Sequence, residues 1–270
     1  MNLAIISLLA VAAYMTAGVG LGLRLSRSQV TSLGKTRLLL LGMSAVILHG
    51  LVLYQTIITP LGANLGFFNA TSLLTWMMAL LLLLAALGKP VENLGIALLP
   101  LAALGLILAA TFRSDHIVSL HTGFSGLDIH IIISVLAYSL LSIAAVQAGL
   151  LAIQDVHLHD KHPGGFIRAL PPLQTAEKLL FQVLTVGFIL LTLSLLTGAI
   201  FLENIFAQHL VHKTSLAILA WIVFGILLWG RWRSGWRGRR AIRWTLGGFS
   251  VLVLAYIGSK LVLELVLGIK

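Results

Sequence analysis

The chain of 270 residues contains no cysteine and very little negative charge. The absence of cysteine excludes disulfide bonds, thiolate metal sites, thioether attachment of a cofactor and any thiol chemistry of its own. Only 8 residues are Asp or Glu, and charged residues make up 10% of the chain, whereas a soluble domain has about 25%. Because 59% of the residues are apolar and the mean hydropathy is +1.04, the composition indicates an integral membrane protein.

Long apolar runs predict the number of membrane-spanning helices. A span needs about 20 apolar residues, and each run here is bounded by charge, glycine or proline. No run alternates polar and apolar residues as a barrel strand does. We therefore expect an all-α integral membrane protein, an eight-transmembrane-helix bundle that forms a single transmembrane domain over residues 1–270. The expected spans are residues 1–22, 38–57, 66–87, 94–111, 130–152, 179–202, 214–230 and 244–267.

The basic residues predict the orientation of these spans. Of the 18 Lys and Arg residues, 14 lie in alternate connections, beginning with the connection after the first span. Basic connections face the cytoplasm, so we expect both termini to lie outside. The net charge of +10 is then a consequence of topology, and no nucleic-acid partner is predicted.

Histidine is the residue type that this sequence offers for chemistry at membrane depth. Among the nine histidines, His49 is the only one deep within an expected span. His130 begins the fifth expected span and His212 immediately precedes the seventh, so both are expected at the outer surface. Imidazoles from different helices can hold the iron of a planar macrocycle between them. Polar capping at the interface is the competing interpretation for His130 and His212, and an interhelical hydrogen bond is the competing interpretation for His49.

Other polar residues give weaker indications of function. His209 and His212, together with His116 and His121, could form an outer zinc or copper site, whereas the histidine-rich inner tract 157–162 is more typical of a solvated loop. Charge is nearly absent from the middle of the spans, which disfavours an ion transporter. The sequence contains no P-loop, no Ser-His-Asp constellation and no pair of catalytic carboxylates, so we predict that the protein is not an enzyme.

The segment from Arg231 to Arg243 is dense in arginine and tryptophan. We expect it to fix the topology, to bind anionic lipid headgroups and to place tryptophan at the membrane interface. Its guanidinium groups could also attract the carboxylates of an anionic ligand, because arginine presents a planar fork to a carboxylate.

Four short stretches carry a resemblance to a known family. They are His130-Ile-Ile-Ile-Ser-Val-Leu-Ala-Tyr-Ser139, His212-Lys-Thr-Ser-Leu-Ala-Ile-Leu-Ala-Trp221, Leu227-Leu-Trp-Gly-Arg231 continued by Gly235-Trp-Arg-Gly-Arg-Arg240, and Leu48-His49-Gly50. With the eight-helix plan, these stretches resemble the cytochrome c assembly proteins of the CcsA, CcmC and HemX type, and in particular the YpjD branch of bacterial inner-membrane proteins. The resemblance covers most of the chain and is most characteristic over about 38–267.

The resemblance implies a multi-pass protein of the bacterial inner membrane that handles haem in or beside cytochrome c biogenesis. It implies that His130 and His212 hold haem b near the outer surface and that His49 is a second-site ligand. It implies no metal other than the haem iron, and other maturation or membrane proteins as partners. One family feature is missing. The haem-presenting members of the family have a tryptophan-rich outer loop, whereas residues 112–129 of this chain contain no tryptophan. A cofactor-free membrane scaffold or accessory subunit, and a small-molecule or metal permease, remain the alternatives.

Overall fold

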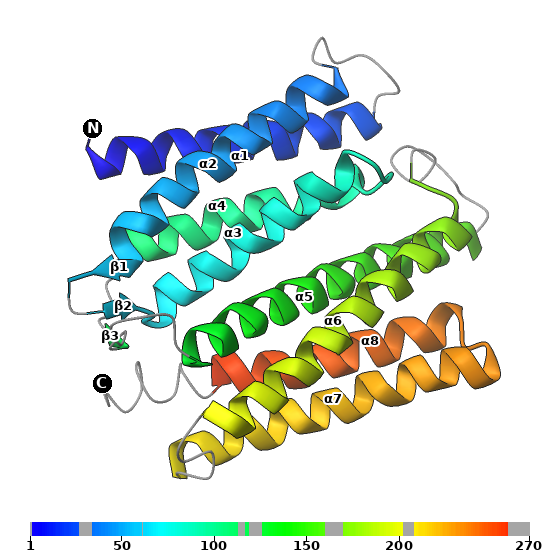
Figure 1. Cartoon of the computed structure of the whole chain (residues 1–270). Coiled ribbons are helices and arrows are strands. Elements are labelled where there is room, and N and C mark those ends of the chain that lie inside the picture. Colours follow the sequence, from blue (N-terminus) through cyan, green and yellow to red (C-terminus); the bar gives the residue numbers. More distant parts are fainter. Residues whose placement is uncertain are drawn as a thin grey trace. The chain divides into compact units, whose positions relative to one another are not determined.

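The computed structural model describes residues 2–26, 34–60, 62–112, 117–118, 126–159, 170–201 and 208–258. The chain forms two compact units, each built mainly of helices (Figure 1). We call Met1–Ser119 with His157–Pro172 the N-terminal unit, and Leu120–Val156 with Leu173–Lys270 the C-terminal unit. The expectation of one transmembrane domain over residues 1–270 stays a prediction.

The N-terminal unit is a bundle in which each helix packs against two neighbours. Helix α1 packs on α2 and α4, and α3 packs on the same two helices. A short 3-10 turn, Glu92–Leu94, leads into the last helix. The four helices are α1 (Leu3–Ser26), α2 (Lys35–Ile57), α3 (Phe67–Ala86) and α4 (Gly95–Thr111).

Small residues bring α1 and α4 close together. A Cβ atom at Gly18 would lie 3.0 Å from Pro100 Cδ, and one at Gly22 would lie 3.7 Å from Ile96 Cγ2. Helices in a membrane associate through such close contacts, because the lipid gives little hydrophobic driving force between them. The Gly18–Gly22 pair of α1 therefore serves helix packing.

A small antiparallel sheet follows α2. Its strands are β1 (Ile58–Thr59), β2 (Gly62–Asn64) and β3 (Ile117–Val118), in the order β1-β2-β3. Ala63 pairs with Ile58 on one side and with Val118 on the other. The all-α prediction missed this sheet, because strands of two or three residues are too short to show alternation of polar and apolar residues.

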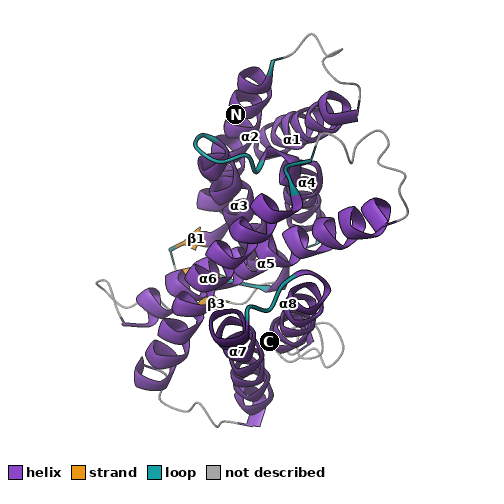
Figure 2. Cartoon of the chain, turned by 90° about the vertical axis from the view of Figure 1, so that its right-hand side faces the viewer, coloured by secondary structure: helices purple, strands orange, loops and turns teal. Residues whose placement is uncertain are grey.

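The C-terminal unit is a second helical bundle, whose helices and joining loops are distinguished by colour in Figure 2. Alanine and leucine side chains such as Ala137, Leu141, Leu180 and Leu227 form its core. Its elements are α5 (Gly126–His159), α6 (Leu173–Phe201), α7 (Gln208–Ser234), α8 (Gly238–Val253) and a π-helical turn, Leu254–Gly258, that continues α8.

Two hydrogen bonds show that α5 and α6 are antiparallel. His130 near the start of α5 contacts Thr197 near the end of α6, whereas Gln147 near the end of α5 donates to the carbonyl of Ala176 near the start of α6. The C-terminal unit therefore has two opposite ends. We call them the histidine end, which contains His130, and the arginine end, which contains Arg231 in the last turn of α7.

Seven helices among the described residues, α1 to α7, are long and apolar enough to cross a membrane. These helices confirm seven of the expected spans. The α-helical part of α8 has 16 residues, and the expected eighth span, 244–267, extends beyond the described residues. Which side of the membrane each terminus occupies stays a prediction.

Several helices are longer than the apolar runs that predicted them. Helix α5 continues beyond residue 152 to His159, and Gln154 in this extension is buried while Val156 and His157 are exposed. The extension thus has both buried and exposed positions, and its Asp155 pairs with Arg239 of α8. Hydrophobicity alone ends a span where charge begins, so it cannot locate the end of such a helix.

Candidate functional site

His49 joins three helices of the N-terminal unit and is completely buried, with 0% of its surface exposed. Its Nδ1 lies 3.3 Å from the Tyr14 hydroxyl on α1, and its Nε2 lies 2.8 Å from Ser72 Oγ on α3. The Tyr14 ring meets the imidazole edge-on, with centroids 5.8 Å apart. We call these three residues the His49 node.

Both ring nitrogens of His49 are engaged in this arrangement. When the Tyr14 hydroxyl donates to Nδ1, the proton of a neutral imidazole lies on Nε2 and is donated to Ser72. No lone pair then remains for a metal ion. The geometry thus shows the interhelical hydrogen bonds of the competing interpretation, and a haem-ligand role for His49 stays a prediction.

The residue after His49 has a packing role of its own. The indole of Trp76 on α3 lies against Gly50, where an added Cβ would be 3.4 Å from the ring, and its Nε1 donates to the carbonyl of Val46 at 2.8 Å. A Cβ at Gly50 would just touch this ring. His49 and Gly50 therefore both contribute to the packing of α2 on α3.

His130 lies in the first turns of α5 and is half-buried. Its Nδ1 is 3.1 Å from Thr197 Oγ1 on α6, and its Nε2 is 3.4 Å from Ser134 Oγ, one turn further along α5. Ser134 Oγ also lies 2.7 Å from Ser194 Oγ on α6. We call these four residues the His130 cluster.

The tautomer of His130 depends on where the hydroxyl hydrogens of Thr197 and Ser134 point. When Thr197 donates its single hydroxyl hydrogen to the backbone carbonyl of Leu193 at 2.8 Å, it accepts from Nδ1–H of His130. Ser134 has its own backbone acceptor, the His130 carbonyl at 2.6 Å. In this arrangement Nε2, which lies 3.4 Å from Ser134 Oγ, is the unprotonated nitrogen, and that is the form of imidazole that binds iron.

Aromatic and cationic groups gather at the histidine end. Tyr138, two turns after His130 on the same face of α5, has its ring centroid 5.7 Å from that of Tyr256 in the π-helical turn. Lys213 Nζ on α7 lies 5.7 Å from the Tyr256 centroid. Helix α7 also carries His212 to this end, although the His212 side chain is outside the described residues. Such π-helical turns are rare and are frequent at functional sites.

Glu177 on α6 organises the arginine end. Its carboxylate is buried, with 8% of the residue exposed, and it accepts hydrogen bonds from Arg231 Nη1 at 2.9 Å and from the Gly238 backbone N–H at 3.4 Å. Arg237 Nε lies 3.5 Å from the same carboxylate, and the Arg231 guanidinium lies 4.6 Å from the Phe181 ring centroid. The sequence analysis did not identify this role of Glu177.

The glycines of the Arg–Trp segment shape the turn between α7 and α8. Gly235 and Gly238 have φ angles of 64° and 55°, which residues with a side chain rarely adopt. The Gly235 N–H donates to the Arg231 carbonyl, as in the usual glycine termination of a helix. A Cβ at Gly230 would collide with the Trp236 ring at 2.5 Å. The Gly-Trp-Arg order of this segment therefore builds a specific turn.

A third contact completes the arginine end. Arg239 Nε donates to Asp155 Oδ2 at 2.8 Å, and this hydrogen bond and the charge of the carboxylate raise the pKa of Arg239. Arg231, Arg237 and Arg239 thus each have a carboxylate partner.

The described residues contain no group of three or more His, Asp or Glu side chains that could hold a metal ion. The candidate outer site falls outside them, since His116 and His121 are not described and the side chains of His209 and His212 are not described either. Of the inner tract, His157 is exposed at the end of α5, and residues 160–162 lie outside the described part.

The apolar helices of both units, seven of which among the described residues are long enough to cross a membrane, define a multi-pass helical membrane protein. The sequence model of the Cytochrome C assembly protein family matches residues 38–267. The chain therefore belongs to the cytochrome c assembly protein family, as the four short stretches predicted.

Individual relatives support this membership. The chain is 35% identical over 228 residues to the inner membrane protein YpjD of Escherichia coli K12, which covers 82% of this chain and 84% of that protein. It is 35% identical over 144 residues to an uncharacterized 28.8 kDa protein of Azospirillum brasilense, covering 53% of each. The cytochrome c biogenesis protein CcsA of Prochlorococcus marinus MIT 9303 is 34% identical over 87 residues, covering 32% of this chain and 27% of CcsA. No solved structure matches the chain.

Proposed function

We propose that this chain is a non-catalytic, haem-handling protein of the bacterial inner membrane that acts in or beside cytochrome c biogenesis. Family membership supports the general role, and the name of the Escherichia coli relative supports the location. Haem b is the cargo that this proposal assigns to the chain, with cytochrome c maturation proteins as its partners. His130 and His212 are the proposed iron ligands.

The observation that carries the proposal is the state of His130. Thr197 Oγ1 lies 3.1 Å from Nδ1, and when it accepts from Nδ1–H, Nε2 carries the lone pair and has only the longer 3.4 Å contact with Ser134. A hydrogen bond to the far nitrogen orients a ligating imidazole and increases its basicity. The His130 cluster therefore fits an axial ligand of haem, whereas the His49 node, with both nitrogens engaged, does not fit one in this arrangement.

The surroundings of His130 suit an anionic aromatic ligand. Tyr138 and Tyr256 offer ring surfaces at the histidine end, and Lys213 offers a cation beside Tyr256. A tetrapyrrole with carboxylate groups has the complementary chemistry, because its ring packs on aromatic side chains and its carboxylates attract an ammonium group.

The proposal is tested by the haem content of the detergent-purified protein from haem-sufficient cells. A reduced-minus-oxidised absorbance spectrum with pyridine haemochrome quantification should give near-stoichiometric haem b for the wild type. The His130→Ala/His212→Ala variant should lose the haem band while it remains folded. His157→Ala is the matched control, because His157 is exposed at the other end of α5, and it should keep its haem.

Two results would count against the proposal. Unchanged haem content in the double variant would remove His130 and His212 as ligands. Absence of haem from the wild type, even after hemin is added, would favour a cofactor-free scaffold, which predicts silent histidine variants and a co-purifying partner. Substrate uptake into vesicles that depends on His49 would favour a permease.

A further inference from the structure

The arginines of the turn between α7 and α8 fall into two groups. Arg231, Arg237 and Arg239 have carboxylate partners in the C-terminal unit. Arg240 stacks on the Trp236 ring, with its guanidinium 5.1 Å from the centroid. Among the described residues, Arg233 and Arg243 have neither an ion pair nor a ring contact, and both are exposed. We call Arg233, Arg240 and Arg243 the arginine patch.

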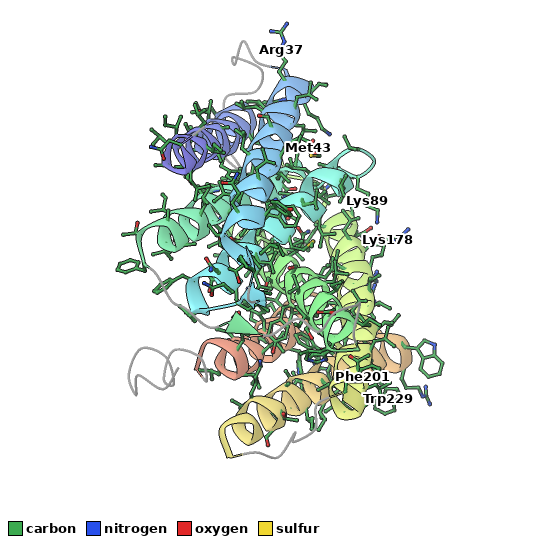
Figure 3. All side chains as sticks on the ribbon, turned by 60° about the vertical axis from the view of Figure 1, so that its left-hand side comes forward. Arg37, Met43, Lys89, Lys178, Phe201 and Trp229 are labelled. Carbon is green, nitrogen blue, oxygen red and sulfur yellow. The ribbon has the colours of Figure 1, made fainter. Side chains whose placement is uncertain are left out.

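An exposed apolar stripe on α7 leads to this patch. Exposed residues recur at helical spacing along one side of the helix and become aromatic toward its end, where Trp229 is 62% exposed and Trp232 is 83% exposed. Figure 3 marks Trp229 on α7. Arg233 follows one turn after Trp229, so the stripe ends in a cation. The apolar members are Ile218, Leu219, Ile222 and Ile226.

This gradation matches the layers of a bilayer. Aliphatic side chains suit the hydrocarbon region, tryptophan is enriched at headgroup level, and arginine beyond it lies among the phosphates. The guanidinium fork matches phosphate oxygens in shape and charge. Within the part of the chain that the structure describes, the arginine patch has no carboxylate partner, whereas Arg231, Arg237 and Arg239 each have one.

We propose that the arginine patch binds the phosphate groups of anionic phospholipids whose acyl chains lie along the apolar stripe of α7. The stripe favours a lipid over a soluble anion, because its exposed Leu, Ile and Trp side chains extend along the helix below the cations. This site is at the opposite end of the C-terminal unit from His130, so it does not depend on the proposed haem site.

The test is retention of phosphatidylglycerol by the delipidated full-length protein, titrated in detergent and read by native mass spectrometry. Arg233→Gln/Arg243→Gln should lower retention by about tenfold, since these substitutions remove two of the three guanidinium groups of the arginine patch that would hold the phosphate. The matched control is Arg37→Gln/Lys89→Gln, which removes two exposed cations of the N-terminal unit (Figure 3). This control should retain phosphatidylglycerol at the wild-type level.

Further arms separate a phosphate site from a simple charge effect. Arg233→Lys/Arg243→Lys keeps the charge that sets topology but loses the planar fork, and its retention should lie between those of the wild type and the Gln variant. Full retention by the Lys variant, or an equal loss in the N-terminal control, would overturn the proposal. Displacement of phosphatidylglycerol by inorganic phosphate would overturn the assignment to lipid, and equal retention of phosphatidylcholine would overturn the requirement for an anionic lipid.

Discussion

His49 in the N-terminal unit and His130 in the C-terminal unit are both polar residues placed among apolar helices, but their surroundings differ. His49 is fully buried and has a hydrogen-bond partner at each ring nitrogen. His130 is half-buried, with Thr197 at 3.1 Å from Nδ1 and only a longer contact, Ser134 at 3.4 Å on its own helix, at Nε2.

The difference teaches that depth in a span does not make a histidine a ligand. A deep imidazole is costly unless both of its nitrogens are satisfied by the protein. Satisfying both nitrogens removes the lone pair that a metal needs. A histidine near a helix end can leave one nitrogen available at a lower cost in free energy. His49 therefore stabilises the packing of three helices, and His130 is the better candidate ligand.

The largest effect that tests this comparison is expected from His49→Ala. The substitution removes two interhelical hydrogen bonds and leaves a cavity beside Tyr14, so we expect it to lower the free energy of unfolding by about 2–4 kcal/mol. Thermal denaturation in detergent measures this loss. His130→Ala, at a half-buried position, should cost about 1 kcal/mol or less. If the two variants were equally stable, the structural role given to His49 would be wrong.

An intermediate effect is expected from Thr197→Val, which sharpens the role of His130. Valine keeps the shape of threonine but cannot accept from Nδ1–H, so the imidazole loses its orientation. Loss of such an outer partner lowers metal affinity by about tenfold or more, and hemin titration followed by absorbance measures it.

Thr197→Ser is the control for this prediction, because serine retains the hydroxyl and should restore most of the affinity. Thermal denaturation of both variants should stay close to that of the wild type. Equal hemin affinity of the Val variant and the wild type would show that Thr197 does not position His130.

The smallest effect is expected from Tyr14→Phe, which removes the hydroxyl that contacts His49 Nδ1 at 3.3 Å. The ring that packs on the imidazole remains. Hydrogen bonds between membrane helices contribute about 0.6 kcal/mol on average, so the loss of stability should be of this size. Haem content should not change, and a loss of haem in Tyr14→Phe would return His49 to the list of ligands.

Much of the fold followed from simple patterns in the chain. Of the eight spans that the apolar runs predicted, seven correspond to described helices that are long enough to cross a membrane, since the interior of a bilayer accepts only apolar segments. Their ends were less predictable, as in α5, where the helix continues beyond the apolar run to His159. The sheet of β1, β2 and β3 left no pattern, because its strands are too short to show one.

The site was predictable in part. The positions of His130 and His212 at the starts of spans identified both as candidates. The partners of each polar group were not predictable, since Glu177 and Arg231 are 54 residues apart and Thr197 lies 67 residues from His130. Helical periodicity tells which residues share a face, but it does not tell which face of another helix lies opposite.

The sequence by itself determined that this is a multi-pass membrane protein of the cytochrome c assembly family, because composition and short motifs do not depend on how helices pack. Only the tertiary structure decided that the partners of His49 come from two other helices, that Thr197 lies beside His130, and which arginines of the α7–α8 turn have carboxylate partners. The physical reason is that a hydrogen bond requires about 3 Å between two atoms. The rotation and depth of neighbouring helices set that distance, and no single helix encodes them.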